Sequence, residues 1–163
     1  MEAALKKSDV RHTGATAYVA LIGWVLLSFA PSLTGVFFGP GDWYRQLEKP
    51  FFNPPNWIFG PVWTTLYLLM GISAWLVWRR GSSGWALKLF IVQLALNALW
   101  TPVFFGLHAL GAALIVIVAM WLAILATIIA FWKLSRPGAA MLIPYLLWVS
   151  FATLLNASLW WLN

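Results

Sequence analysis

The sequence predicts an all-α integral membrane protein that folds as one bundle of five transmembrane helices, and three observations support this fold class. First, 63% of the 163 residues are hydrophobic and only 9% are charged, whereas a typical soluble domain is about 25% charged. Second, four long runs contain no charged residue, and about 20 apolar residues suffice to cross the hydrocarbon core of a bilayer. Third, these runs are continuously apolar and do not alternate as the strands of a membrane barrel do.

The expected spans follow the four uncharged runs in order. The first run, 13–41, and the second run, 50–78, each hold one span. The third run, 89–132, is too long for a single crossing at about 1.5 Å per residue, so we expect it to turn back at "FGLHALG", residues 105–111. The last run, 137–163, holds one more span. The five expected spans are residues 18–38, 57–78, 85–105, 109–132 and 139–161.

Outside the spans, the chain contains a basic tail and one long connection. Residues 1–16 form the tail, and the apolar run behind it is too long for the core of a cleavable signal peptide, so we expect the first span to remain. The connection at about residues 39–56 is the only one long enough to hold a functional element. We therefore interpret residues 1–163 as a single domain.

We interpret the net charge of +6 as a sign of membrane orientation and not of nucleic-acid binding. Two of the ten Lys and Arg residues, Arg45 and Lys49, are offset by Asp42 and Glu48 on one side of the membrane. The positive-inside rule therefore predicts a cytoplasmic N-terminus. As a separate expectation, we place the protein in a bacterial cell envelope. The eight cations expected on the cytoplasmic side are Lys6, Lys7, Arg11, Arg79, Arg80, Lys88, Lys133 and Arg136.

The titratable residues exclude several kinds of chemistry. The sequence has no cysteine, two histidines and four acidic residues, so disulfides and thiolate chemistry are excluded and no metal site can be assembled. The spans contain no charged residue at depth, which disfavours ion-coupled transport. We expect no metal and no required cofactor.

Polar and aromatic side chains recur at helical spacing on three of the expected spans. For Gln93 and Asn156, hydrogen bonding between helices is as well supported as a role in binding. Trp63 and Trp148 lie several residues inside their spans, so an inward cavity lined by aromatics is as well supported as simple core packing. The residues that share faces are Gln93, Asn97 and Thr101 with Trp100 on the third span, Trp63 and Tyr67 on the second, and Trp148, Ala152 and Asn156 on the fifth.

The fourth span is apolar and carries small residues at four-residue spacing. Such spacing favours close helix packing, either within the chain or between two chains. The small residues are Ala119, Ala123, Ala126, Thr127 and Ala130.

The segment "KPFFNPPNWIFGPVW", residues 49–63, crowds prolines and aromatics at the start of the second span. Proline fixes its own backbone and biases the preceding residue to extended conformations, so Pro54 and Pro55 predict a stiff elbow that leads into the helix. Such a segment suits a lid over an apolar cavity. A rigid anchor at the membrane interface is an equally good interpretation of the same residues.

Four stretches of the chain resemble the TspO family of tryptophan-rich sensory proteins and translocator proteins. They are "APSLTG" (30–35), "WYRQLEKPFFNPPNWIFGPVWTTLYLLMG" (43–71), "QLALNALWTPVFFG" (93–106) and "PYLLWVSFATLLN" (144–156). The resemblance implies a five-helix membrane protein, often a homodimer, with a ligand pocket under the first loop. The ligands it implies are porphyrins such as protoporphyrin IX and haem, sterol-like lipids, and drugs of the benzodiazepine and isoquinoline types.

The resemblance also implies which residues form the pocket, and it shows where this chain departs from the family. The C-terminal "LLNASLWWLN" lacks the Tyr and the Lys or Arg of the family's sterol segment, and Phe51 and Phe52 stand where bacterial relatives often carry tryptophan. Lys88 and Val92 replace a glycine pair that animal members use in packing. The implied ligand-binding residues are Ala30, Leu33, Trp57, Phe59, Trp63, Tyr67, Asn97, Trp100, Trp148, Ala152 and Leu155, with Pro54 and Pro55 in the lid.

Our leading hypothesis is therefore a membrane receptor or regulator of flat hydrophobic ligands, linked to tetrapyrrole handling or to a stress response. Ligands would bind by stacking and burial, with Asn97 and indole N–H groups orienting their polar atoms. One alternative is an enzyme that degrades porphyrin in light. Another is a translocator of porphyrin or lipid, which ranks lowest because no alternating-access device is visible.

Overall fold

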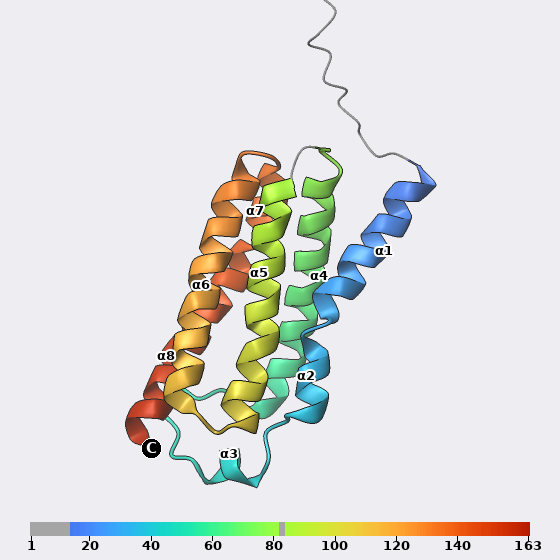
Figure 1. The fold of residues 1–163 in the computed structure, drawn as a ribbon. Coiled ribbons are helices and arrows are strands. Elements are labelled where there is room, and N and C mark those ends of the chain that lie inside the picture. Colours follow the sequence, from blue (N-terminus) through green and yellow to red (C-terminus); the bar gives the residue numbers. More distant parts are fainter. Residues whose placement is uncertain (1–13, 82–83) are drawn as a thin grey trace, which may run out of the picture.

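The computed structural model describes residues 14–81 and 84–163, and within these residues every regular element is helical. In chain order the elements are α1 (Ala15–Phe29), α2 (Ser32–Phe37), α3 (Asp42–Gln46), the 3-10 turn η1 (Asn56–Ile58), α4 (Phe59–Trp78), α5 (Gly84–Thr101), the π-helical turn η2 (Pro102–Gly106), α6 (Leu110–Trp132), α7 (Arg136–Met141) and α8 (Ile143–Leu162). The stretches long and apolar enough to cross a membrane are Ala15–Phe37, Asn56–Trp78, Gly84–Gly106, Leu110–Trp132 and Arg136–Leu162. The predicted five-helix membrane bundle is confirmed (Figure 1).

The first span is broken, and the prediction of one helix over residues 18–38 was wrong in this respect. α1 ends at Phe29 and α2 begins at Ser32, with Ala30 and Pro31 between them. Proline has no amide hydrogen, and its ring clashes with the carbonyl group four residues earlier, so a regular helix cannot pass through Pro31. The break lets α2 take a different neighbour from α1.

The last span also consists of two helices and starts earlier than the predicted residue 139. α7 begins at Arg136, and α8 follows after Leu142. Ser135 caps α7 by accepting a hydrogen bond from the Gly138 amide at 3.3 Å. Pro144 lies in the first turn of α8, where the missing amide hydrogen costs little.

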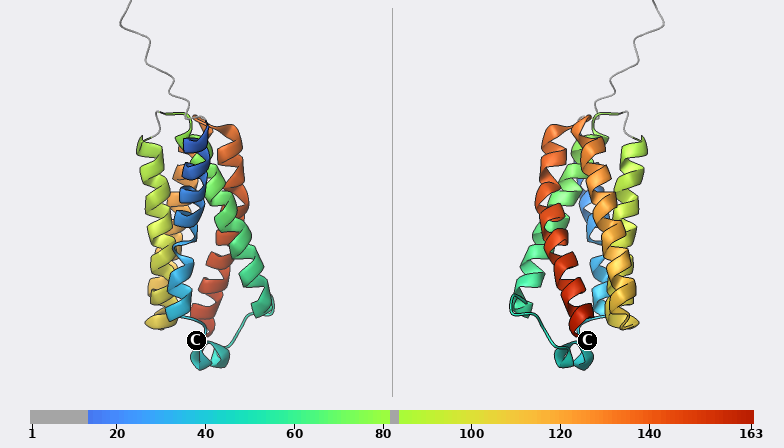
Figure 2. Two further views of the ribbon diagram at one scale, coloured as in Figure 1. Left: turned by 90° about the vertical axis from the view of Figure 1, so that its right-hand side faces the viewer. Right: turned by 90° about the vertical axis from the view of Figure 1, so that its left-hand side faces the viewer.

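The centre of the bundle is formed where α4, α5, α6 and α8 meet, as the views in Figure 2 show from two sides. α6 packs against α5, α7 and α8, and α4 packs against α7. Met70, Phe90, Phe131 and Tyr145 are fully buried in this core. Of the five small residues expected to pack closely on α6, Thr127 and Ala130 are buried within the chain, whereas Ala119, Ala123 and Ala126 are only partly buried.

α1 is attached to the bundle mainly through α4. A Cβ atom on Gly71 would lie 2.5 Å from Cα of Val25, so only glycine lets the two backbones approach this closely. The indole of Trp75 donates a hydrogen bond of 2.7 Å to the carbonyl oxygen of Ala17. These contacts form a closed seam between α1 and α4.

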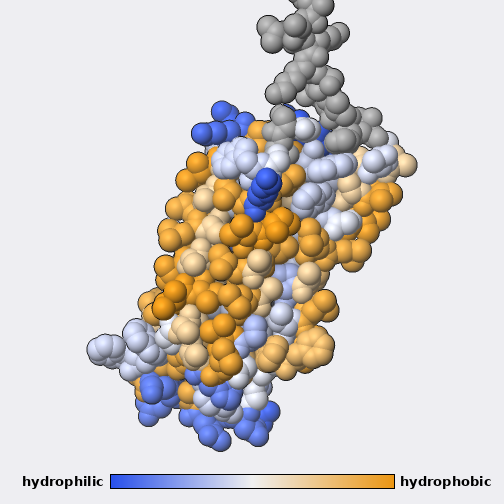
Figure 3. Space-filling view, in the orientation of Figure 1, coloured by the Kyte–Doolittle hydropathy of each residue, from blue (hydrophilic) through white to orange (hydrophobic). Residues whose placement is uncertain are grey.

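Hydrophilic residues gather at the two ends of the molecule, and an apolar band lies between them (Figure 3). One end holds the start of α1 and the connections after α4 and α6, with Arg79, Arg80 and Lys133. The other end holds α3 and the C-terminal Asn163. The described spans thus place the start of α1 and the end of α8 at opposite ends, as an odd number of crossings requires. Lys6, Lys7 and Arg11 lie outside the described residues.

Candidate ligand-binding site

A cavity of about 450 Å³ opens inside the bundle near the end that carries α3. Its volume falls within the range of about 300 to 1,000 Å³ that is usual for small-molecule sites. None of the described residues that line it is charged, and aromatic side chains form much of its wall. The lining residues are Phe29, Pro31, Ser32, Gly35, Phe38, Gly39, Pro40, Tyr44, Asn56, Phe59, Gly60, Trp63, Thr64, Tyr67, Asn97, Trp100, Thr101, Phe104, Phe105, Ile117, Met120, Trp148, Val149, Ala152, Leu155, Asn156 and Leu159.

Asn97 organises the polar part of this cavity. Its Oδ1 accepts a hydrogen bond from the Tyr67 hydroxyl at 3.0 Å, and its Nδ2 donates to the Tyr145 hydroxyl at 2.8 Å. The Tyr145 hydroxyl lies 3.5 Å from Sδ of Met120. The network joins α4, α5, α6 and α8, so Asn97 connects helices and lines the cavity at the same time.

Asn156 holds Trp100 in the cavity wall. The indole N–H of Trp100 donates to Oδ1 of Asn156 at 3.1 Å, and Nδ2 of Asn156 donates to the Leu110 carbonyl at 2.9 Å. The expectation that indole N–H groups orient a ligand therefore does not extend to Trp100, because its donor is already used. Asn156 makes the hydrogen bonds between helices that one interpretation expected, and it also lines the cavity.

Trp63 on α4 and Trp148 on α8 form aromatic parts of the wall. The Trp63 ring stacks on Tyr67 with a centroid distance of 5.3 Å, and Trp148 meets Phe59 edge-on at 5.9 Å. Within the described part of the chain, neither indole N–H donates a hydrogen bond to another residue. Both donors can therefore serve an acceptor atom of a ligand.

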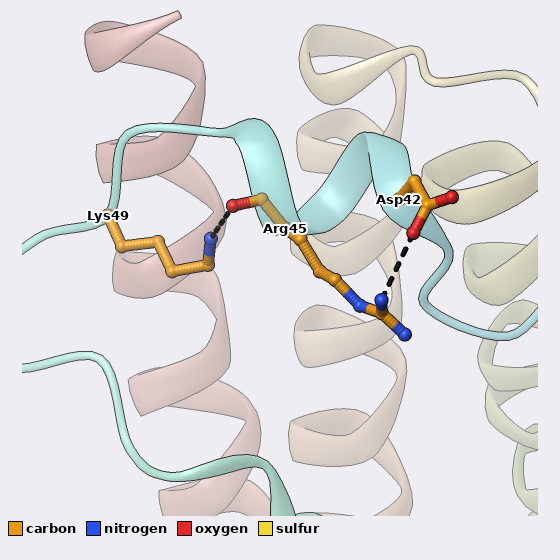
Figure 4. A network of polar contacts seen from close by, with 3 residues as sticks. All are labelled: Asp42, Arg45 and Lys49. Carbon is orange, nitrogen blue, oxygen red and sulfur yellow. Dashed lines mark hydrogen bonds and ion pairs between the residues drawn. The ribbon is translucent and has the colours of Figure 1, made fainter.

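The connection between α2 and α4 covers one end of the cavity, and we call residues 39–55 the lid. Lys49 organises it: its ammonium group donates to the carbonyl oxygens of Tyr44, Arg45 and Leu47 at 2.8, 3.2 and 3.1 Å. Figure 4 shows the contact with Arg45 and the ion pair of Arg45 with Asp42 at 3.1 Å. Burial raises the pKa of Tyr44 above its ordinary value, so this phenol stays neutral.

Two contacts attach the lid to the rest of the bundle. The Trp43 ring stacks on His108, in the turn before α6, with a centroid distance of 4.1 Å and an interplanar angle of 14°. The backbone of Glu48 exchanges two hydrogen bonds with the Asn163 side chain, of 3.0 and 3.1 Å. The lid is thus connected to both the α5–α6 turn and the end of α8.

Pro54 and Pro55 connect the lid to α4 and do not line the cavity. Pro55 is extended with φ −58° and ψ 142°, and η1 starts directly after it. The elbow expected from the sequence is therefore present, whereas the cavity is covered by other residues of the same connection, among them Gly39, Pro40 and Tyr44. A lid function of the prolines stays a prediction.

Eight of the eleven residues expected in the pocket line the cavity, and three do not. Ala30 and Leu33 are exposed because the break at Pro31 turns Pro31, Ser32 and Gly35 toward the cavity instead. Trp57, in η1, is 73% exposed. The eight that line it are Phe59, Trp63, Tyr67, Asn97, Trp100, Trp148, Ala152 and Leu155.

Among the lining residues that sequence reasoning missed, two pairs differ in the signal that the sequence offers. Phe104 and Phe105 come from "TPVFFG" at the end of the third span, where an aromatic pair next to a proline is a signal that could have been used. Ile117 and Met120 lie on α6, whose apolar sequence gives no signal at all. Only the packing of α6 against α5 and α8 brings them to the cavity.

Comparison with known proteins agrees with this architecture. Residues 15–162 match the model of the TspO/MBR family. The chain is 45% identical over 134 residues to "Protein CrtK" of Rhodobacter capsulatus, covering 80% of this chain and 84% of that protein. It is 46% identical over 127 residues to the "Tryptophan-rich sensory protein" of Cereibacter sphaeroides, covering 78% and 80% of the two chains. It is 39% identical over 154 residues to the human "Translocator protein", covering 90% and 91%.

The family match spans nearly the whole chain, and several relatives exceed 30% identity over most of their length. The four segments on which the resemblance rested lie in the first, second, third and fifth spans and in the connection that covers the cavity. The chain belongs to the TspO/MBR family.

Proposed function

We propose that this protein is a membrane receptor or regulator that binds porphyrins and other flat hydrophobic ligands in the cavity beneath the lid. The observation that supports this most strongly is the uncharged, aromatic-lined cavity of about 450 Å³ inside the bundle. A flat apolar ring buried there gains from leaving water and from stacking on Trp63 and Trp148. Ligand carbonyl groups accept hydrogen bonds from the two unused indole N–H groups.

The cavity chemistry also limits how a porphyrin binds. Burying an ionised carboxylate without a partner is costly, and no cation lies among the described lining residues. We therefore expect the carboxylates of protoporphyrin IX or haem to stay at the edge of the cavity while the ring enters it. Drugs of the benzodiazepine and isoquinoline types carry no such charge and fit the proposal without this restriction. Sterols are weaker candidates, because the segment "LLNASLWWLN" departs from the family's sterol pattern.

Relatives named for sensing and for translocation support a role in response to ligands or in their movement. For this chain we propose sensing, linked to tetrapyrrole handling or to a stress response. No required cofactor is part of the proposal.

Titration of the purified protein with protoporphyrin IX, first in the dark and then in light, tests this function. We expect saturable quenching of tryptophan fluorescence with an unchanged Soret band in both conditions. Absence of saturable quenching would refute the proposed binding.

The same titration separates the two alternatives. The stacked pair of Trp63 and Tyr67 lines the cavity and contains two side chains that can exchange electrons with an excited ring. Loss of the Soret band in light that disappears in Trp63→Phe would therefore favour the degrading enzyme. Transfer of porphyrin across a vesicle membrane would favour the translocator.

We also propose a homodimer in a bacterial cell envelope with the N-terminus in the cytoplasm. α1 leaves most of its surface open, and this apolar face, with Val19, Ile22 and Leu26, lies against lipid or a second copy. Mass measurement of the protein in nanodiscs tests the dimer. A single chain per nanodisc at all protein concentrations would contradict it.

A further inference from the structure

The break in the first span gives its two helices, α1 and α2, different neighbours in the bundle. Above the break, α1 follows α4 along the seam formed by Gly71 and Trp75. Beyond Pro31, α2 packs against α5 instead. Phe38, directly after α2, covers Gly106 of η2 so closely that a Cβ atom there would lie 2.7 Å from the phenyl ring. α2 is thus held on the α5 side of the bundle.

As a result, α2 and the first turns of α4 diverge toward the lid. The left view of Figure 2 shows this divergence, with α8 behind it. Ser32 and Gly35 on α2, and Gly60 and Thr64 on α4, line the cavity and are also exposed at the molecular surface. The cavity is therefore open to the outside between these two helices.

The residues that form the rim of this opening have small, uncharged side chains or none. A Cβ atom added at Gly35 or Gly60 would meet no other atom within 4 Å. The Ser32 hydroxyl donates to the Phe29 carbonyl oxygen at the end of α1 at 2.6 Å, and the Thr64 hydroxyl donates to the Gly60 carbonyl oxygen of α4 at 2.9 Å, so both hydrogen-bond donors are already used. The rim thus offers space without exposing an unpaired donor of these residues.

The opening faces the membrane and not the water. Apolar side chains on the outer faces of both helices flank it, with Leu33 61% exposed, Val36 76% and Leu68 46%. All of them belong to stretches that can span the bilayer. On the water side, the lid is attached through the stack of Trp43 on His108 and through Asn163.

We propose that the gap between α2 and α4 is a lateral portal through which apolar ligands pass between the lipid and the cavity while the lid stays in place. The inference rests on the proposed binding function and adds its route. Ligands that partition into the bilayer are concentrated beside the portal and reach the cavity without crossing the lid. The portal thus favours lipid-soluble rings over water-soluble ones.

Placing a bulky group on the rim tests the portal. The chain has no cysteine, so Thr64→Cys and Thr65→Cys each create a single site for a bulky maleimide. The two threonines are adjacent and exposed, and both donate to the carbonyl four residues earlier, but only Thr64 lines the cavity. Protoporphyrin IX is added in vesicles, and tryptophan quenching gives its association and dissociation rates.

We expect the label at residue 64 to slow both rates by about tenfold or more relative to the unlabelled Thr64→Cys protein, as expected when access limits exchange. The label at residue 65 should change them little. Equal slowing at both sites, or none at residue 64, would overturn the portal while leaving the binding function intact. If the unmodified protein does not bind protoporphyrin IX at all, both the function and the portal are wrong.

A second pair of variants covers the case in which the label at residue 64 enters the cavity and abolishes binding. Gly35→Leu adds bulk at the rim, and Gly23→Leu adds the same bulk on α1, away from the cavity and again without a neighbour within 4 Å. We expect Gly35→Leu to slow association and dissociation together, with Gly23→Leu close to the wild type. Wild-type rates in Gly35→Leu would overturn the proposal.

Discussion

Two tryptophans of α8 have different surroundings, and these surroundings assign them different roles. Trp148 lines the cavity and contacts Phe59 and Phe151. Trp161 is 84% exposed, as expected for an anchor at the membrane interface. Composition alone does not distinguish the two.

We predict that Trp148→Ala weakens protoporphyrin IX binding by about 1 to 3 kcal/mol, because it removes a large stacking surface from the cavity wall. Trp161→Ala is the matched control on the same helix and should bind normally. Titration by tryptophan quenching measures both. Equal losses in the two variants would mean that Trp148 is not part of the binding surface.

Gln93 is a buried polar residue that makes no side-chain hydrogen bond within the described part of the chain. Its side chain is 1% exposed, and neither amide atom has a hydrogen-bond partner within the described residues. We predict that Gln93→Met stabilises the protein by about 1 to 3 kcal/mol, since it removes a buried unpaired amide with little change in volume. Thermal unfolding in detergent measures the change.

Asn97→Leu, one turn along the same helix, is the control variant, for which we expect a loss of stability and not a gain. This change removes the partner of the Tyr67 and Tyr145 hydroxyls and should lower the melting temperature. A lower melting temperature for Gln93→Met as well would contradict our description of Gln93.

At the scale of elements, the seam between α1 and α4 depends on one glycine. We predict that Gly71→Ala destabilises the protein by on the order of 1 to 3 kcal/mol, because its Cβ atom would lie 2.5 Å from Cα of Val25 and force the helices apart. Gly23→Ala on α1 meets no atom within 4 Å and should be neutral or stabilising. If the two variants melt alike, the seam does not hold α1 in place.

The lid is the second element whose role can be measured. Replacing Pro54 and Pro55 by glycine frees the backbone between α3 and α4, so ordering the lid over a ligand becomes more costly. We predict weaker binding, on the order of 1 kcal/mol or more, with unchanged helical content. A double variant that binds normally but melts early would show that the prolines serve the fold and not the lid.

At the scale of the whole molecule, the distribution of charge predicts the orientation. Arg79 and Arg80 follow α4, Lys133 follows α6 and Arg136 begins α7, all at the end where α1 starts, whereas α3 and Asn163 lie at the other end. The positive-inside rule then predicts a cytoplasmic N-terminus and a C-terminus on the opposite side. Reporter fusions to each terminus measure this. Reporters on the same side would contradict the arrangement of five crossings, and reporters on swapped sides would contradict the orientation alone.

The number of spans could be predicted from the sequence alone because a bilayer imposes a local requirement. Each crossing needs about 20 apolar residues in a helix that satisfies its own hydrogen bonds, so the count follows from composition along the chain. The faces that carry Trp63, Tyr67, Asn97 and Trp148 also follow from local periodicity. The break at Pro31 was equally local, and its signal was present in the sequence.

The partners of these faces were decided only by the tertiary structure. Whether Trp100 offers its N–H to a ligand depends on Asn156, which is distant in the sequence, and whether Leu33 lines the cavity depends on which helix α2 meets beyond the break. Ile117 and Met120 reach the cavity through packing that no pattern within α6 encodes. Helical periodicity determines which residues share a face, but the neighbour of that face is set by contacts between distant segments.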